Sequence, residues 1–255
     1  MELVIQLYQY DYITEPIEYL RISKYTRQYE ILDCLHRNLL HPHINKIHIL
    51  LEKESNYEFY KSCLELNPQK EKCVFTVFGS QPRYADLVEY CKNTIKDNTI
   101  VCIQNSDIYF GHDLSRSFLE ESIDSNTLVS LTRHEHTTDN HEECNVKTCP
   151  LIFDYQGSHD SFLFRTPIPE SFPFHSITHY QNVYGGETVF MKAWVECGKQ
   201  LKNPCFDIKI FHRHVNHFYL KQYETIANGY LCSVNPSAPV GRDDIKSQLK
   251  TIFNS

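Results

Sequence analysis

The sequence predicts an α/β fold in which helices flank a central, mixed but mostly parallel sheet. Short apolar runs alternate with helical patterns along the first half of the chain, and such alternation is typical of sheets that carry helices on both faces. The 255 residues, 41% of them hydrophobic, are enough to bury a full core. Neither a repeat nor a Gly/Ser-rich linker divides the chain. We therefore expect a single domain over residues 1–255.

The first half of the chain predicts a βαβαβαβ series. Its strands are short apolar runs such as LVIQLY and KIHILL, and its helices place apolar residues about three or four positions apart. The first helix should end before His41-Pro42, because a residue that precedes proline is pushed out of the α region. Strands are expected at residues 3–8, 46–51, 73–78 and 99–104, and helices at 27–40, 58–66 and 84–95.

The second half of the chain is less regular. A polar loop rich in His and Cys extends over residues 133–150, and loops of this length inside a compact domain are usually functional or mobile. Residues 236–255 contain several Pro and Gly, and we expect them to form a tail packed on the surface. Strands are expected at 127–132, 161–165 and 206–211, and a helix at 186–199.

Composition excludes several classes of protein. The 25 basic and 32 acidic residues give a net charge of −7, and no run of Lys or Arg would follow a nucleic-acid backbone. The first ten residues do not resemble a signal peptide, and no window approaches the roughly 18 apolar residues of a spanning helix. We expect a cytoplasmic protein with no nucleic-acid partner and no membrane span. Its 10 cysteines are about 4% of the chain, below the roughly 8–10% that is typical of disulfide scaffolds. Most of them should therefore be reduced and buried.

A polar triplet, Asn105-Ser106-Asp107, follows the apolar run at 99–104, and a second apolar run resumes directly after it. In open α/β sheets, ligands bind at the carboxyl ends of the strands. A carboxylate at such an end suits Mg²⁺ or Mn²⁺, which take oxygen ligands and share them with substrate phosphates. The simplest alternative is an aspartate that begins a turn.

The order of several motifs resembles that of a known family. The motifs are, in order, RQYEILDCLHRNLLHPHINKIHILLE, FGSQPRYADLVEYCKN, IVCIQNSDIYF, LVSLTRHE, GSHDSFLFRTPIP and NPCFDIKIFHRH. In this order they resemble GT-A-like glycosyltransferases of large DNA viruses and of some algae or plants, and they are similar to the N-terminal domain of a chlorella-virus rhamnosyltransferase. The resemblance covers roughly residues 1–220 and depends on the shared order of these short motifs.

The resemblance implies a GT-A (Rossmann-like) fold and glycosyltransferase activity. Such an enzyme would move a sugar from a nucleoside-diphosphate sugar, with a UDP-sugar as the expected donor, to a hydroxyl of a glycan or other small acceptor. A divalent cation, Mn²⁺ or Mg²⁺, would neutralise the diphosphate, with Asp107 as its ligand. The family signature is Asp-x-Asp, and Asn105 stands in place of its first aspartate, which weakens the expected cation site. Inversion is expected, although one candidate base leaves retention open.

The same resemblance implies residues that contact the donor. Gln6, Leu7 and Tyr8, at the exit of the first strand, would frame the nucleotide base. Asn105 and Ser106 would lie beside the donor, with Asn105 as a partner of the sugar or ribose.

Two arginines are further candidates for the donor site. Arg27 and Arg83 would contact donor phosphate or ribose, because a guanidinium matches phosphate with two parallel hydrogen bonds. The alternative is a pair of surface arginines that form ion pairs with Glu30 and Asp86.

Asp160 and Glu187 are the candidate catalytic residues. Asp160 precedes an apolar strand and would take the proton of the acceptor hydroxyl; alternatively, it caps a turn. Glu187 follows two glycines at the expected helix start, where it would bind acceptor hydroxyls or compete as the base. It would equally suit the positive end of the helix dipole.

Two histidines complete the predicted metal site. His212 or His214 would bind the cation or touch the diphosphate, as a histidine near the C-terminus does in many GT-A enzymes. Alternation along a strand sends both side chains to one face and Arg213 to the other. The alternative is a polar surface pair.

The loop at 133–150 raises the question of a zinc site. Its cysteines are spaced Cys-x₄-Cys with scattered histidines, which is looser than the spacing of structural zinc sites. A disulfide between the two is not favoured in a reducing compartment. Two other functions therefore stay open: a non-catalytic GT-A-like module that binds a nucleotide or glycan, and a zinc-stabilised interaction protein. The possible ligands are His134, His136, His141, Cys144 and Cys149.

Overall fold

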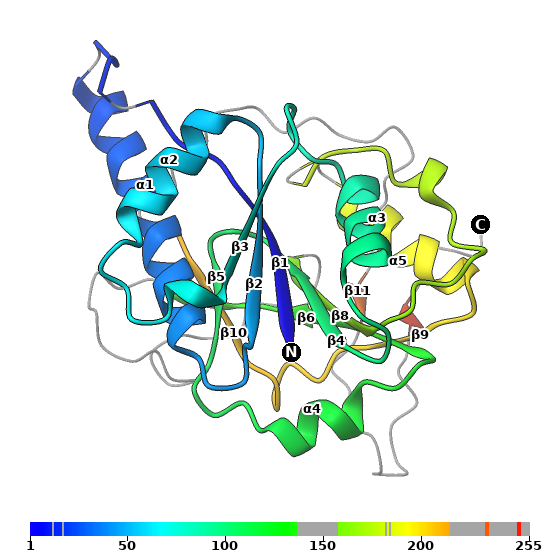
Figure 1. Cartoon of the computed structure of the whole chain (residues 1–255). Coiled ribbons are helices and arrows are strands. Elements are labelled where there is room, and N and C mark those ends of the chain that lie inside the picture. Colours follow the sequence, from blue (N-terminus) through cyan, green and yellow to red (C-terminus); the bar gives the residue numbers. More distant parts are fainter. Residues whose placement is uncertain are drawn as a thin grey trace.

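The computed structural model describes residues 1–11, 13–16, 18–136, 158–181, 183, 185–214, 233–234 and 249–250. Its centre is a seven-stranded sheet with the order β3-β2-β1-β4-β8-β6-β9 (Figure 1). Neighbouring strands run parallel except at β8, which is antiparallel to β4 and β6. In sheet order, the strands span Cys73–Val77, Lys46–Leu51, Glu2–Leu7, Ile100–Gln104, His159–Arg165, Thr127–Thr132 and Gln200–Lys202.

The central strands are apolar on both sides because both faces of the sheet are covered. Ile5 of β1 pairs with Ile49 of β2 and with Gln104 of β4. Alternate residues of β1 enter different cores, with Leu3 on one face and Val4 on the other. Since β2 and β4 flank β1 on opposite sides, the carboxyl ends of β1 and β4 form the switch point at which such sheets bind ligands.

Helices cover both faces of the sheet. Figure 1 shows α1 and α2 on one side of the strands and α3 and α5 on the other. The short helix α4 contributes Leu119 to the same core as α1 and α2. The helices are α1 (Glu18–Leu40), α2 (Glu54–Cys63), α3 (Tyr84–Thr94), α4 (Arg116–Ser122) and α5 (Gly186–Glu196), with 3₁₀ turns at Lys70–Lys72 and Phe174–Ser176.

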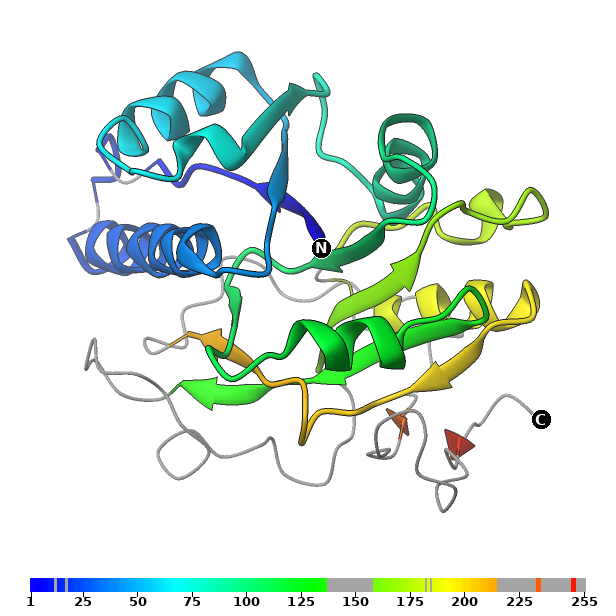
Figure 2. The ribbon, with the colours of Figure 1, turned by 60° about the horizontal axis from the view of Figure 1, so that its bottom comes forward.

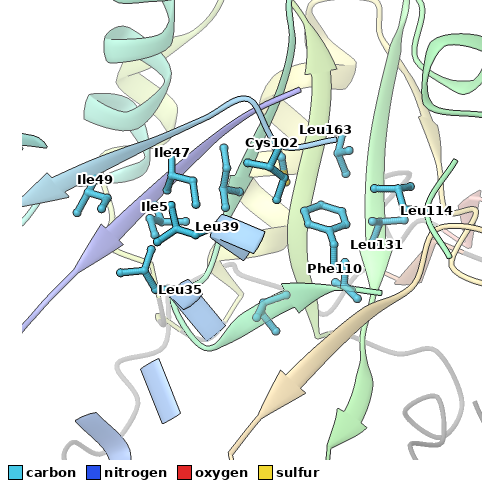
Figure 3. Packing of buried hydrophobic residues seen from close by; sticks show 14 of the residues in the cluster. Ile5, Leu35, Leu39, Ile47, Ile49, Cys102, Phe110, Leu114, Leu131 and Leu163 are labelled. Atoms are coloured by element: carbon cyan, nitrogen blue, oxygen red, sulfur yellow. The ribbon is translucent and has the colours of Figure 1, made fainter. Parts of the chain in front are cut away.

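The core beneath α1 holds this helix against the sheet. Leu35 and Leu39 of α1 pack with Ile5 and Ile47 of the first two strands, and Phe110 joins them (Figure 3). Burying each such side chain contributes about 1.5–3 kcal/mol. The position of α1, and of the polar residues along it, is therefore fixed.

A second, three-stranded sheet lies beside the central one. In it, β10 (Ile210–Arg213) lies between β5 (Ile108–Phe110) and β7 (His134–His136), as Figure 2 shows with β10 in orange. β10 is antiparallel to β5 and parallel to β7. Two short strands, β11 (Ser233–Val234) and β12 (Leu249–Lys250), pair separately.

The predicted fold class is confirmed: the chain has an α/β, GT-A-like (Rossmann-like) arrangement with a mostly parallel central sheet between helices. The strands predicted at 46–51 and 127–132 have the expected bounds. The other predicted strands of this sheet differ by only one or two residues at an end.

Two helices begin earlier than the sequence predicts. α1 begins at Glu18 rather than at residue 27, and only its later part packs on the core, since Ile22 and Tyr25 are exposed. The first turns of α1 therefore have no buried apolar face that would let the sequence predict them as helix. α2 spans Glu54–Cys63 rather than 58–66, and Leu66 is 96% exposed.

The second half of the chain departs further from prediction. β10 begins at Ile210 rather than at residue 206, because Asp207 and Ile208 donate backbone hydrogen bonds to Pro204 O in a turn. α5 ends at Glu196 rather than at 199, because Gly198 adopts a positive φ of 83°. The predicted loop is wrong at His134–His136, which form β7. The short elements α4, β5 and β9 were not predicted, since three to seven residues show no clear periodicity.

Other expectations are met in part. The described cysteines are free, and four of them are buried: Cys34, Cys91, Cys102 and Cys205. Among the helices that the structure describes, none is long and apolar enough to cross a membrane. Most of the predicted tail at 236–255 and residues 137–157 lie outside the described residues.

Candidate functional site

A pocket lies at the carboxyl ends of β1 and β4. The space of about 310 Å³ inside it includes open solvent, so this is a pocket on the surface and not an enclosed cavity. Amide and hydroxyl groups surround it together with a single carboxylate, so the lining suits a polar, largely uncharged ligand group. The residues are Gln6 and Tyr8 from the end of β1, Asn105, Ser106 and Asp107 after β4, Gln81 before α3 and Gln181 before α5.

Asp107 is the carboxylate of this pocket. Arg27 of α1 forms an ion pair with its Oδ2, and Nε2 of His212 lies 3.0 Å from the same oxygen. Burial alone would raise the pKa of Asp107, but the charges of Arg27 and His212 hold it well below its usual value. Asp107 is therefore ionised at neutral pH.

Backbone pairing brings Asp107 and His212 together. The antiparallel register of β5 and β10 places His212 opposite Ile108, directly after Asp107. The backbone N–H of Arg213 donates to Asp107 O at 2.9 Å. Residues more than 100 positions apart thus meet because two short strands pair.

His212 is held at both ring nitrogens. Its Nδ1 lies 2.9 Å from Glu135 Oε2, while its Nε2 faces Asp107. Burial would lower the pKa of His212, but the two carboxylates raise it above its usual value. Burial likewise would raise the pKa of Glu135, yet His212 and Arg133 lower it to about 2. The two carboxylates therefore favour the protonated form of the His212 ring.

Asp107, His212 and His214 form the group of described residues that could hold a metal ion. One ligand atom from each lies within 4.8 Å of the others. The rings of His212 and His214 are 5.4 Å apart, as the alternation along β10 predicts. One carboxylate and two imidazoles suit Mn²⁺ better than Mg²⁺, which prefers oxygen ligands. The residues fit a divalent cation that replaces the proton on His212 Nε2 and competes with Arg27 for Asp107.

Asp160 lies inside β8, not in a loop, and is only 3% exposed. Arg133 Nη1 donates to its Oδ2 at 3.0 Å, and Asn105 Nδ2 donates to its Oδ1 at 2.6 Å. These contacts give a physical reason for an asparagine at position 105. An aspartate at position 105 would set a second carboxylate against Asp160, whereas the amide donates to it.

Glu187 is the second carboxyl group on this side of the site. It lies in the first turn of α5, which Gly185 begins at a positive φ of 82°. Its Oε2 accepts a hydrogen bond from the backbone N–H of His159 at 3.0 Å. Burial and the nearby charge of Asp160 raise the pKa of Glu187 to about 8. Glu187 is therefore mostly protonated at neutral pH.

Three of the predicted donor residues do not line the pocket. Leu7 points away from it into the core beneath α1, because it alternates with Gln6 and Tyr8 along β1. Arg27 is buried, and its Nη1 donates to Glu30 Oε2 and to the backbone oxygen of Arg213, each at 2.9 Å.

Arg83 is exposed at the start of α3. Its backbone N–H donates to Asp86 Oδ2 at 2.7 Å, and its guanidinium lies 5.4 Å from the centre of the Tyr180 ring. Gln81, two residues earlier, lines the pocket.

The described histidines of the suggested zinc loop are buried in the fold. His136 Nδ1 lies 2.9 Å from the hydroxyl of Tyr109, and His134 Nε2 lies 3.4 Å from Cys205 O. The other possible ligands, His141, Cys144 and Cys149, lie outside the described residues. Zinc binding stays a prediction.

Sequence reasoning missed four residues of the site. Arg133 and Glu135 link the two sides, since Arg133 Nε donates to Glu135 Oε1 at 2.7 Å. Arg133 and Glu135 are two positions apart, with His134 between them, and a strand places such residues on one face. This spacing was a usable signal. Gln81 and Gln181 lie in loops, and nothing in the sequence distinguishes them.

Comparison with known proteins leaves the family open. No protein-family model matches the chain, and no curated protein matches it. Solved structures with a similar fold include S. aureus TarS 1–349, with 9% identity, 83% of this chain and 59% of that chain covered, and a TM-score of 0.48. The match thus spans less than two thirds of the TarS chain.

Two further structures share the general fold. The inositol-1-phosphate CTP transferase from T. maritima is 10% identical, with 83% of this chain and 88% of that chain covered and a TM-score of 0.40. HddC from Yersinia pseudotuberculosis is 15% identical, with 64% and 76% covered and a TM-score of 0.34. At these values the likeness extends to the fold alone, so the function is argued from the chain's own residues.

Proposed function

We propose that the chain is a glycosyltransferase. It would transfer a sugar from a nucleoside-diphosphate sugar, with a UDP-sugar as the donor, to a hydroxyl of a glycan or other acceptor. One observation carries the proposal: the ionised Asp107 lies in a pocket at the switch point of the sheet, beside two imidazoles that complete a donor set for a divalent cation.

The residues of the site divide into two groups by role. Asp107, His212 and His214 would hold Mn²⁺, which would supply positive charge for the departing diphosphate. The amides and hydroxyls of the pocket would hold the uncharged part of the donor through hydrogen bonds. Arg27 would keep Asp107 oriented through its ion pair.

Asp160 and Glu187 would handle the acceptor proton. A base works best when its pKa lies near the operating pH, and the pKa of Glu187, about 8, meets this condition. Asp160 would contribute through Glu187, because the negative charge of Asp160 raises the pKa of Glu187. One direct displacement by the activated hydroxyl would invert the anomeric carbon.

A donor panel tests the proposal. Sugars linked to UDP, GDP and dTDP would be incubated with the protein with and without Mn²⁺, and release of the nucleoside diphosphate would be measured. We expect release with one donor class that depends on Mn²⁺ and falls at least ~100-fold in Asp107→Asn. Asp113→Asn, which removes a carboxylate from an exposed ion pair with Lys209, is the control. Mn²⁺-independent release, or full activity in Asp107→Asn, would refute the proposal.

A non-catalytic module that binds a nucleotide or glycan is the second candidate. The pairing of Asp107 with both Arg27 and His212 favours it, because a carboxylate already neutralised in this way has less need of a cation. Binding of a nucleotide in calorimetry without turnover of any donor would decide for this function.

A further inference from the structure

A continuous row of charged contacts joins the two sides of the site. Glu135 Oε2 lies 2.9 Å from His212 Nδ1, and its other oxygen accepts from Arg133 Nε at 2.7 Å. The same guanidinium donates from Nη1 to Asp160 Oδ2 at 3.0 Å. Two residues of one short segment thus contact a predicted metal ligand and a predicted catalytic carboxylate.

The contact with Glu135 decides which nitrogen of His212 faces Asp107. An imidazole that donates from Nδ1 to a carboxylate has Nε2 available as a ligand, and such an outer carboxylate also fixes the plane of the ring. Glu135 lies on β7, which runs parallel to β10, and its register partner is His212 itself. The backbone therefore holds this pair in place independently of any bound ligand.

Arg133 provides the other half of the link. One guanidinium reaches two carboxylates because its donors are arranged as a planar fork. A lysine could not reach both carboxylates with the same geometry. Arg133 therefore contacts one carboxylate on each side of the site.

We propose that Glu135 and Arg133 are positioning residues: Glu135 orients His212 toward a divalent cation, and Arg133 aligns Asp160 with that site. This inference rests on the proposed function, and it adds to it a physical connection between cation binding and the acceptor side. Neither residue is among those that line the pocket.

Mn²⁺ binding by the donor-free protein tests the role of Glu135. Free Mn²⁺ would be counted by electron paramagnetic resonance, so the readout does not depend on activity. Glu135→Gln keeps the shape of the side chain and removes its charge, and we expect the Kd for Mn²⁺ to rise at least ~10-fold. Glu120→Gln is a matched control, since Glu120 also lies 2.7 Å from an arginine, Arg165, and we expect its Kd to stay within about 2-fold of wild type.

A second variant tests the role of Arg133. We expect Arg133→Lys to lower kcat at least ~10-fold while the KM for the donor changes little, because only the acceptor side loses its alignment. Glu135→Asp keeps the charge and should recover part of the Mn²⁺ affinity that Glu135→Gln loses. If Glu135→Gln fails to fold, Glu135→Asp replaces it in the Mn²⁺ binding measurement.

The outcomes separate this inference from the proposed function. If wild type binds no Mn²⁺ and turns over no donor, the proposed function is wrong. If wild type binds Mn²⁺ and Glu135→Gln binds it equally well, the positioning role of Glu135 is wrong and the proposed function stands. Equal losses in Glu120→Gln would likewise overturn the positioning role, since any lost ion pair would then have the same effect.

Discussion

The two sides of the site hold their carboxyl groups in opposite ways. Asp107 has a guanidinium and an imidazole against one oxygen, and its pKa is well below the usual value. Glu187 accepts a backbone hydrogen bond beside the negative Asp160, and its pKa is raised to about 8. The comparison shows that neighbouring charges, and not the residue type, set the pKa of each carboxyl group. The side of Asp107 therefore suits a bound cation, and the side of Glu187 suits proton exchange.

The largest expected effect comes from removing the charge of Asp107. Asp107→Asn removes the anion that the buried Arg27 and His212 share, and leaves Arg27 with Glu30 and His212 with Glu135. Breaking a buried ion pair costs about 3–5 kcal/mol. Asp113→Asn is the comparison, since Asp113 also pairs with a cation but its side chain is 51% exposed, and it should cost at most about 1 kcal/mol. Urea denaturation of both variants measures the difference. If both variants lose the same free energy of unfolding, the ion pairs of Asp107 contribute no more to stability than a surface ion pair.

An intermediate effect is expected from Glu187→Gln, and it depends on pH. Because folding raises the pKa of Glu187 from 4.5 to about 8, its contribution to stability is fully present below pH 4.5 and is lost as the pH rises through 8. The glutamine does not titrate, so the variant should become more stable relative to wild type as the pH rises from 4 to 9. Thermal or urea unfolding across this range measures the gain.

A stability difference that stays constant with pH would contradict the assignment of Glu187 as the protonated member of the pair. The pH–rate profile offers a second check on the same group. Activity that rises with an apparent pKa near 8 would indicate Glu187 as the base, and its loss in Glu187→Gln should follow.

The smallest effect is expected at Gln104, the last residue of β4 and the neighbour of Asn105. Its side chain is fully buried, and neither its amide nitrogen nor its oxygen has a hydrogen-bond partner among the described residues. Leaving such a group unpaired costs about 1–3 kcal/mol. Gln104→Met, of similar shape, should therefore stabilise the protein by about 1–2 kcal/mol in urea denaturation and leave Mn²⁺ binding unchanged. A loss of stability would show that the amide is satisfied.

Local patterns were enough to predict the parallel half of the fold. KIHILL has the bounds of β2 because six consecutive residues, all but Lys46 buried, leave no ambiguity about its ends. The first turns of α1 were missed because Ile22 and Tyr25 face outward, so periodicity there points to no core. The packed part of α1 nucleates the helix, and each further residue adds a hydrogen bond at little cost, so the helix extends towards Glu18 without an apolar pattern.

Most of the site residues that the sequence predicts lie at strand ends, and Glu187 lies at a helix start. Asp107, His212 and His214 follow from that rule, and the structure brings them together. Arg27 pairs with Glu30, as the alternative to a phosphate contact predicts, and also with Asp107, 80 positions away, which no local pattern indicates. The contact of Glu135 with His212 likewise depends on the pairing of β7 with β10, 77 positions apart, which no local pattern encodes.

The most direct test of the central claim is a crystal structure of the protein soaked with Mn²⁺ and a UDP-sugar, with anomalous data collected for manganese. If Asp107 holds the cation, we expect an anomalous peak within about 2.5 Å of an Asp107 oxygen, shared with His212 or His214 and with the donor diphosphate. A bound donor with Asp107 still paired to Arg27, and no peak beside it, would contradict the account.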